Sequence, residues 1–221
     1  MSIVFMKEID HLKRQILALS AQVEESVILA VKSLLTRDEE LAQQVIRGDF
    51  DVDDVEVAVE EEAFKIMALY QPVAADLRFL TCVLKINNDL ERIGDLATNI
   101  AKRAVKICKE PALTMPDELS QAAIRARDMV HDSLTAFVNF DADPARKVCG
   151  SDDEVDQLCR QVRRFVEAQI EKHPVGISGY LDMLLASRNI ERIGDHATNI
   201  AEDVIYLVEG TIVRHRPEAT I

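Results

Sequence analysis

Apolar side chains recur every three or four positions along most of the chain, the spacing that gathers them on one face of an α-helix. This spacing predicts helices over residues 9–34, 38–47, 52–69, 77–107, 117–139, 141–149, 152–172 and 178–208. We expect Gly48, Pro72 and Gly210 to end the helices before them, because both residue types are typical helix terminators. The segments 111–116 and 173–176 are predicted as a linker and a turn.

The sequence contains an internal repeat. ERIGDLATNIA at residues 91–101 returns as ERIGDHATNIA at residues 191–201, with ten of eleven positions identical. The preceding predicted helices repeat more faintly, at a spacing of 103 rather than 100 residues. A repeat of this length predicts an all-α protein of two tandem three-helix bundles. We place the first unit at residues 1–110, the second at 117–212 and a tail at 213–221.

The amino-acid composition further restricts the fold class and the possible binding partners. Seven glycines and six prolines in 221 residues are too few for an all-β fold, which needs many turns. The formal net charge of −13 disfavours binding to nucleic acid and to anionic lipid surfaces. The four cysteines form no CxxC pair, and no long apolar run or leader-like start is present, so we expect reduced thiols and a cytoplasmic protein.

Pairs of acidic residues four positions apart stand out in both repeats. The pairs are Asp49 with Asp53, Glu91 with Asp95, Asp152 with Asp156, and Glu191 with Asp195. Residues i and i+4 are neighbours on one helix face, so each pair places two like charges side by side. A single pair of this kind is usually just a solvated helix face, but four pairs in matching positions favour a cation between them.

The spacing also predicts how these pairs meet. If the two helices of a repeat form an antiparallel hairpin, residues at the same height lie equally far from the turn. Asp49 with Asp95, and Asp53 with Glu91, are both centred on position 72, which is Pro72. In the second repeat Asp152 with Asp195, and Asp156 with Glu191, are centred between positions 173 and 174. Both predicted turns therefore bring four carboxylates to one level.

Clustered carboxylates suit hard cations such as Mg²⁺, Mn²⁺, Ca²⁺ or iron. Asn99 and Asn199 lie one turn further on and could add a carbonyl oxygen. The acidic face points away from the main apolar stripe, so we expect two surface sites. The first should be the more anionic, because Glu56 and Glu60 correspond to Cys159 and Arg163. Arg92 and Arg192 are interpreted as ion-pair partners of the carboxylates, and not as phosphate-binding groups. His196, which replaces Leu96, is interpreted as incidental and not as a metal ligand.

Signatures of known enzyme classes are missing. The chain has no G-x-x-x-x-G-K, G-x-G-x-x-G, G-x-S-x-G or H-E-x-x-H motif, and no Glu-x-x-His of di-iron bundles. Three hypotheses remain open. The chain could be a metal-loaded regulatory adaptor, a helical scaffold whose acidic faces bind basic partners without metal, or, less favoured, a metal-dependent phosphohydrolase.

The doubled ERIGDxATNIA segments resemble the PhoU family of accessory regulators of bacterial phosphate uptake. QPVAADLR at residues 71–78 and Gly48-Asp49 are similar to two further motifs of that family. The resemblance covers about residues 5–212 and implies two similar three-helix bundles with surface metal clusters. It assigns the metal to the eight paired carboxylates, with iron, zinc, manganese or magnesium as the ion.

The resemblance also implies a role that charge and periodicity do not give. It implies a non-enzymatic negative regulator that damps phosphate import and keeps phosphate-responsive two-component signalling quiet when phosphate is plentiful. The implied partners are the ATPase subunit of the phosphate ABC transporter, a phosphate sensor histidine kinase and a second copy of the chain. Contact with the membrane would come only through these partners.

Overall fold

The computed structural model describes residues 3–110, 113–172 and 176–213, and within them every regular element is a helix. The helices are α1 (Ile3–Thr36), α2 (Glu39–Tyr70), α3 (Ala74–Lys109), α4 (Asp117–Asn139), α5 (Ala142–Cys149), α6 (Asp152–Lys172) and α7 (Ile177–Glu209). The all-α prediction is confirmed. None of the helices in the described ranges has the length and apolar content needed to cross a membrane.

The helix starts repeat as the sequence does. Asp38 caps α2 by accepting hydrogen bonds from the backbone N–H groups of Glu40 and Leu41. Asp141, 103 positions later, caps α5 by accepting from the N–H of Asp143. The residues before these caps, Arg37 and Phe140, both have positive φ angles, of 55° and 53°. The two repeats therefore turn from one helix to the next with the same local chemistry.

Gly48 does not end a helix, and this prediction was wrong. The helix α2 continues through it from Glu39 to Tyr70. A single glycine lowers helix stability by only about 1 kcal/mol, which the packing of the neighbouring apolar residues outweighs. The break occurs in the second repeat instead, where α5 ends at Cys149 and α6 begins at Asp152. The other predicted helix ends are confirmed to within three residues, except that α1 begins at Ile3 and not at residue 9. Residues 111–112 of the predicted linker and 173–175 of the predicted turn lie outside the described ranges.

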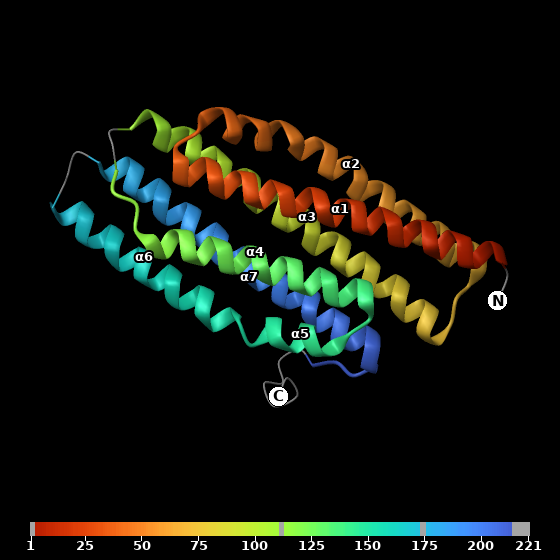
Figure 1. Ribbon diagram of the computed structural model, residues 1–221. Coiled ribbons are helices and arrows are strands. Elements are labelled where there is room, and N and C mark those ends of the chain that lie inside the picture. Colours follow the sequence, from red (N-terminus) through yellow and green to blue (C-terminus); the bar gives the residue numbers. More distant parts are fainter. Residues whose placement is uncertain (1–2, 111–112, 173–175, 214–221) are drawn as a thin grey trace.

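Two long helices form the centre of the molecule. Figure 1 shows α3 and α7 running side by side, with α1 and α2 packed on one of them and α4, α5 and α6 on the other. They are antiparallel, because Cys82 near the start of α3 reaches the backbone of Asp203 near the end of α7, at 3.5 Å. Near their other ends, Arg103 is 2.9 Å from Asp182. The structure thus has two three-helix units joined along α3 and α7.

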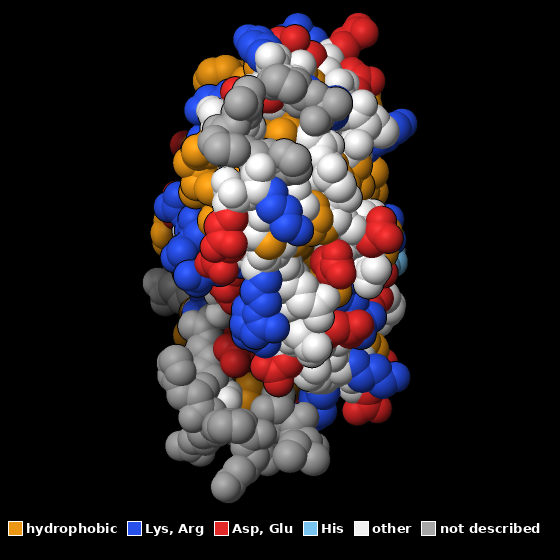
Figure 2. Space-filling model, turned by 90° about the vertical axis from the view of Figure 1, so that its left-hand side faces the viewer, with side chains coloured by type: hydrophobic (Ala, Val, Ile, Leu, Met, Phe, Trp, Pro, Cys, Tyr) orange, Lys and Arg blue, Asp and Glu red, His pale blue; other side chains and the backbone are white. Residues whose placement is uncertain are grey.

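The core is formed by the predicted apolar stripes. The charged side chains outside it are of both signs. Leu12, Ile16, Leu19 and Leu34 on α1 are fully buried in the apolar core that runs through both units. On the face of the molecule shown in Figure 2, acidic and basic side chains alternate rather than separate into fields. The net charge of −13 therefore does not make this face uniformly acidic. Of the predicted tail, Val213 is buried and the other residues lie outside the described ranges.

Candidate functional site

The first acidic pairs lie where α2 packs closely against α3. The chain turns at Gln71, which adopts a left-handed conformation with a φ angle of 47°, so the turn falls beside the predicted Pro72. A Cβ atom on Gly94 would lie 3.3 Å from Cγ1 of Val52, so the two helix backbones approach closely at this height. One turn away, the hydroxyl of Thr98 donates a hydrogen bond to Asp49 across the same interface, at 2.9 Å.

The hairpin brings carboxylates of the two helices within electrostatic range. We call Asp49, Asp53, Glu91 and Asp95 the first carboxylate cluster. Burial raises the pKa of Asp53, and the negative charges of Asp49 and Asp95 raise it further. Burial also raises the pKa of Glu91, and Asp95 and Asp53 add to the rise while Arg92 opposes it. Mutual effects of this kind show that charges on α2 and α3 face one another.

The second carboxylate cluster, Asp152, Asp156, Glu191 and Asp195, is formed in the same way by α6 and α7. Burial, followed by the charges of Asp195 and Asp156, raises the pKa of Asp152 to about 6. The pKa of Glu191 is raised by burial first, and then by Asp156 and Asp195. Burial and Asp156 likewise raise the pKa of Asp195. The four residues therefore repel one another at neutral pH.

One oxygen in the second cluster lacks a partner. Oδ1 of Asp152 is buried and accepts no hydrogen bond from any described residue. It lies close to the α7 backbone, 3.5 Å from where a Cβ atom of Gly194 would be. A buried carboxylate oxygen without a donor costs free energy, and a cation would supply the missing partner. The chemistry of these donors fits a hard, oxygen-preferring cation.

The side chains as placed do not complete a coordination sphere. Within the described part of the chain, no three Asp, Glu, His or Cys side chains are grouped so that they could hold a metal ion. The helices thus bring the predicted carboxylates to the same level, and the metal-binding role of the eight residues stays a prediction.

The two asparagines differ from each other. Asn99 is exposed, and its neighbour Thr98 makes the contact with Asp49. The side-chain amide of Asn199 donates to Oδ1 of Asp89 on α3, at 3.4 Å. The amide nitrogen of Asn199 therefore connects the two repeats, and the role of its carbonyl oxygen as a metal ligand stays a prediction.

The charges around the two clusters are unequal, as the substitutions between repeats predict. Glu56 lies beside the first cluster, where its pKa is raised by burial and then by Glu60 and Asp53. At the second cluster the equivalent Cys159 is buried, and Arg160 is 3.4 Å from Asp156. The first cluster therefore gathers more carboxylates than the second.

The arginine of the first repeated motif pairs with the carboxylates beside it. Arg92 lies 3.2 Å from Glu91 and 3.3 Å from Asp95, which confirms the predicted ion pairing at this position. At the second cluster, the charge of Arg192 lowers the pKa of Asp195 against the effect of burial. Both arginines thus offset part of the repulsion among the carboxylates.

His196 contacts the first repeat, which the apolar spacing of the chain does not predict. Its Nδ1 atom is 2.8 Å from Oδ1 of Asp89, a carboxylate on α3 of the first repeat that is only 7% exposed. A signal for this pair was present, because position 196 is the one difference between the two eleven-residue motifs. His196 therefore joins the two repeats.

The repeated motif has counterparts in other proteins. A model described as the PhoU domain matches residues 16–104 and again residues 119–204, more than half of the chain. The chain belongs to the PhoU family. A relative from Pseudomonas putida, named "Phosphate-specific transport system accessory protein PhoU homolog", is 41% identical over 212 residues, covering 96% of this chain and 83% of the relative. The Escherichia coli protein of the same family, an accessory protein by name, is 34% identical over 96% of this chain and 88% of its own length.

Solved structures of the PhoU family share the fold. The crystal structure of PhoU from Pseudomonas aeruginosa superposes with a TM-score of 0.91 at 39% identity, covering 94% of this chain and all of that chain. A second crystal structure, of "the phosphate transport system regulatory protein PhoU" from Streptococcus pneumoniae, gives a TM-score of 0.88 at 27% identity, with 95% and 99% covered. Tandem helical bundles of the PhoU type are therefore the fold of this chain, and phosphate transport is its functional setting.

Proposed function

We propose that this chain is a non-enzymatic, metal-binding regulator of phosphate uptake. Its relatives are named as accessory proteins of phosphate-specific transport systems, and a structural neighbour is titled a regulatory protein. The proposal adds that regulation is negative, so that the loaded protein restrains the transporter and the associated two-component signalling when phosphate is plentiful. The absence of known catalytic motifs from the sequence supports a role other than catalysis.

Metal binding is supported by the two carboxylate clusters. Each cluster places carboxylates from two helices where they raise one another's pKa, a strain that a divalent cation would relieve. The unpartnered Oδ1 of Asp152 is the single observation that most directly supports cation binding. The first cluster would hold its ion through Asp49, Asp53, Glu91 and Asp95, and the second through Asp152, Asp156, Glu191 and Asp195. Iron, manganese, magnesium and zinc remain the ions to be distinguished.

Metal content after purification tests this proposal. We expect the double variant Glu91→Gln with Asp95→Asn to lose about half of the bound metal, because it neutralises two ligands of one cluster and leaves the other intact. The matched control is Glu61→Gln with Asp143→Asn, which removes the same charge from exposed positions outside the clusters. Elemental analysis of both proteins gives the answer. Equal metal content in the two variants, with both folded by circular dichroism, would reject the first cluster as a metal site.

A scaffold that binds basic partners without metal is the second candidate. It is favoured by the lack, among the described residues, of three side chains grouped to hold an ion. Dialysis against a chelator followed by calorimetric titration with Mn²⁺, Fe²⁺, Mg²⁺ and Zn²⁺ separates the two candidates. Saturable binding that the cluster variants lose supports the regulator with metal, and no saturable binding supports the scaffold.

The proposed role in phosphate uptake also suggests the partners of the chain. We infer that the chain acts in the cytoplasm, on the ATPase subunit of the phosphate transporter and on the phosphate sensor histidine kinase, and that it forms a homodimer. Contact with the membrane would be made only through these partners. Co-purification of the chain with each of the two proteins, and sedimentation of the chain alone, test the three associations separately.

A further inference from the structure

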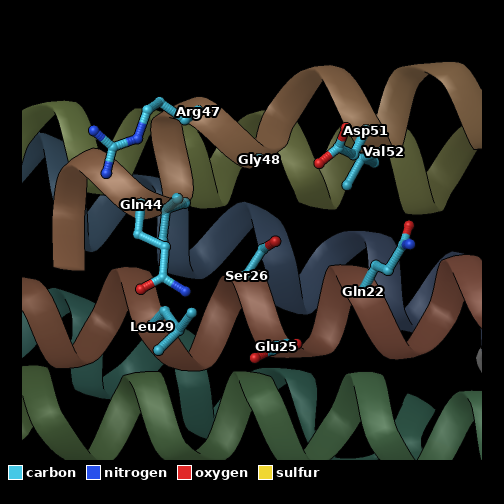
Figure 3. Close-up of a pocket in the computed structure, with 10 residues that line it drawn as sticks. Gln22, Glu25, Ser26, Leu29, Gln44, Arg47, Gly48, Asp51 and Val52 are labelled. Carbon is cyan, nitrogen blue, oxygen red and sulfur yellow. The ribbon is translucent and has the colours of Figure 1, made fainter.

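A polar groove lies between α1 and α2 of the first repeat, on a different side of α2 from the first carboxylate cluster. Its volume is about 380 Å³. Figure 3 shows Ser26 on α1 and Asp51 on α2 extending toward the space between the two helices, which Gln44 spans at one end. Gly48 has no side chain and has open space beside its Cα atom, so α2 leaves the groove open at this point. The groove is therefore a concave site with a carboxylate at its edge.

Polar groups of this groove are free to bind a ligand. Among the described residues, no basic side chain forms an ion pair with Asp51, which is exposed. Ser20 and Ser33 on the same helix bond back to backbone carbonyls at 2.7 Å. Within the described part of α1 and its surroundings, the hydroxyl of Ser26 makes no such bond. The groove thus offers two carboxylates, Glu25 and Asp51, together with a hydroxyl and side-chain amides, and its lining also includes one basic residue, Arg47.

The second repeat pairs the equivalent positions with each other. Its residues equivalent to Gln22 and Asp51, at the spacing of 103 that also relates the helix caps, are Arg125 and Glu154. Arg125 on α4 reaches Glu154 on α6, with 2.7 Å between nitrogen and oxygen. The second repeat therefore bridges its two helices with its own guanidinium group. The first repeat keeps the acid but has Gln22 in place of the arginine.

We propose that the groove between α1 and α2 binds an arginine side chain presented by a partner protein. A guanidinium carries five N–H donors in a planar fork, which can pair with the Asp51 carboxylate while another N–H group donates to Ser26. A net charge of −13 favours approach of a basic partner. The proposal requires no metal and does not depend on the proposed function. Residue 51 lies about 200° around the helix from residues 49 and 53, so the two sites are separate.

Titration of the full chain with a blocked Gly-Arg-Gly peptide, followed by amide NMR in the presence of a chelator, tests the groove. We expect saturable shift changes centred on Ser26, Gly48 and Asp51, with a dissociation constant in the millimolar range for so small a probe. The same peptide with citrulline, the neutral isostere of arginine, should bind at least ten-fold more weakly. Equal binding of the two peptides, or shifts confined to other surfaces, would overturn the proposal.

Variants separate this groove from general acidity. Asp51→Asn should weaken binding of the arginine peptide at least ten-fold, whereas Glu154→Gln, the matched change in the second repeat, should leave it unchanged. Gln22→Arg should supply an internal guanidinium, as Arg125 does, and abolish peptide binding, whereas Gln22→Met should retain it. Since Gln22 and Asp51 are exposed, we expect all four variants to fold. If Gln22→Arg leaves binding intact, or if free arginine binds ten-fold more tightly than the blocked peptide, docking of a protein side chain is wrong.

Discussion

At the scale of single residues, Asp152 carries the largest electrostatic strain in the two clusters. Burial and its acidic neighbours raise its pKa from 3.8 to about 6, so the folded state holds a proton that the unfolded chain has already released between these pH values. Its contribution to stability is therefore lost as the pH rises from about 4 to about 6. Neutralising the side chain should remove this loss.

We predict that Asp152→Asn stabilises the metal-free protein at pH 7 by about 1 kcal/mol. The raised pKa alone would correspond to more, but the side chain is only partly buried and solvent screens the repulsion. At pH 5, where the wild-type residue is largely protonated, the gain should shrink. Urea unfolding in a chelating buffer at both pH values measures it. The control Glu171→Gln changes an exposed carboxylate far from the clusters, and a gain of the same size there would remove the explanation.

The pair of His196 and Asp89 makes a second prediction at this scale. Replacing His196 by Leu, the residue of the first repeat, leaves the buried Asp89, among the described residues, with only the distant amide of Asn199. We therefore expect a loss of about 1–3 kcal/mol in the free energy of unfolding. Asp89→Asn combined with His196→Leu should cost less than the two single changes added together. The double-mutant cycle by urea unfolding gives the coupling energy, which we expect at about 1 kcal/mol. A coupling near zero would mean that the two side chains do not interact.

At the scale of helices, the glycines of α2 and α3 act differently. Gly48 lies inside α2 with open space around it, so Gly48→Ala should stabilise the protein by about 0.5–1 kcal/mol through helix propensity. Gly94 faces Val52 at the closest approach of α2 and α3, and an added methyl group would meet it at 3.3 Å. Gly94→Ala should therefore gain less than Gly48→Ala or destabilise. Thermal unfolding of both variants compares them, and equal gains would argue against a close approach at Gly94.

The same helices show what can be read from the sequence. Apolar spacing, Pro72 and the capping residues Asp38 and Asp141 predict the helices and the first turn, because these signals act over a few neighbouring positions. The prediction failed at Gly48, where tertiary packing outweighs a weak local preference. The contact of His196 with Asp89 depends on how α3 slides along α7, and apolar periodicity does not specify that register. For the same reason the sequence places carboxylates at one level but does not fix their side-chain geometry.

At the scale of the whole molecule, the two repeats share buried charges. Asp182 and Asp203 on α7 are 7% and 2% exposed, and they pair with Arg103 and Lys85 on α3 at 2.9 and 3.0 Å. A carboxylate buried at an interface is tolerated only while its partner is present. Separation of the repeats would break both ion pairs and expose the apolar interface between α3 and α7, which we call the seam. We infer that the two repeats unfold as one cooperative unit.

Asp182→Ala tests this cooperativity. The substitution leaves Arg103 without its partner at the seam, so we expect a loss of about 1–3 kcal/mol in the free energy of unfolding. Because the repeats are joined there, amide hydrogen exchange should accelerate in α2 of the first repeat as much as in α6 of the second. The matched control is Glu167→Ala, which breaks an exposed pair with Arg163 inside one helix and should cost less than about 0.5 kcal/mol. Faster exchange in the second repeat alone would show that each repeat is stable by itself, and the shared seam would then be an interface between two independent domains.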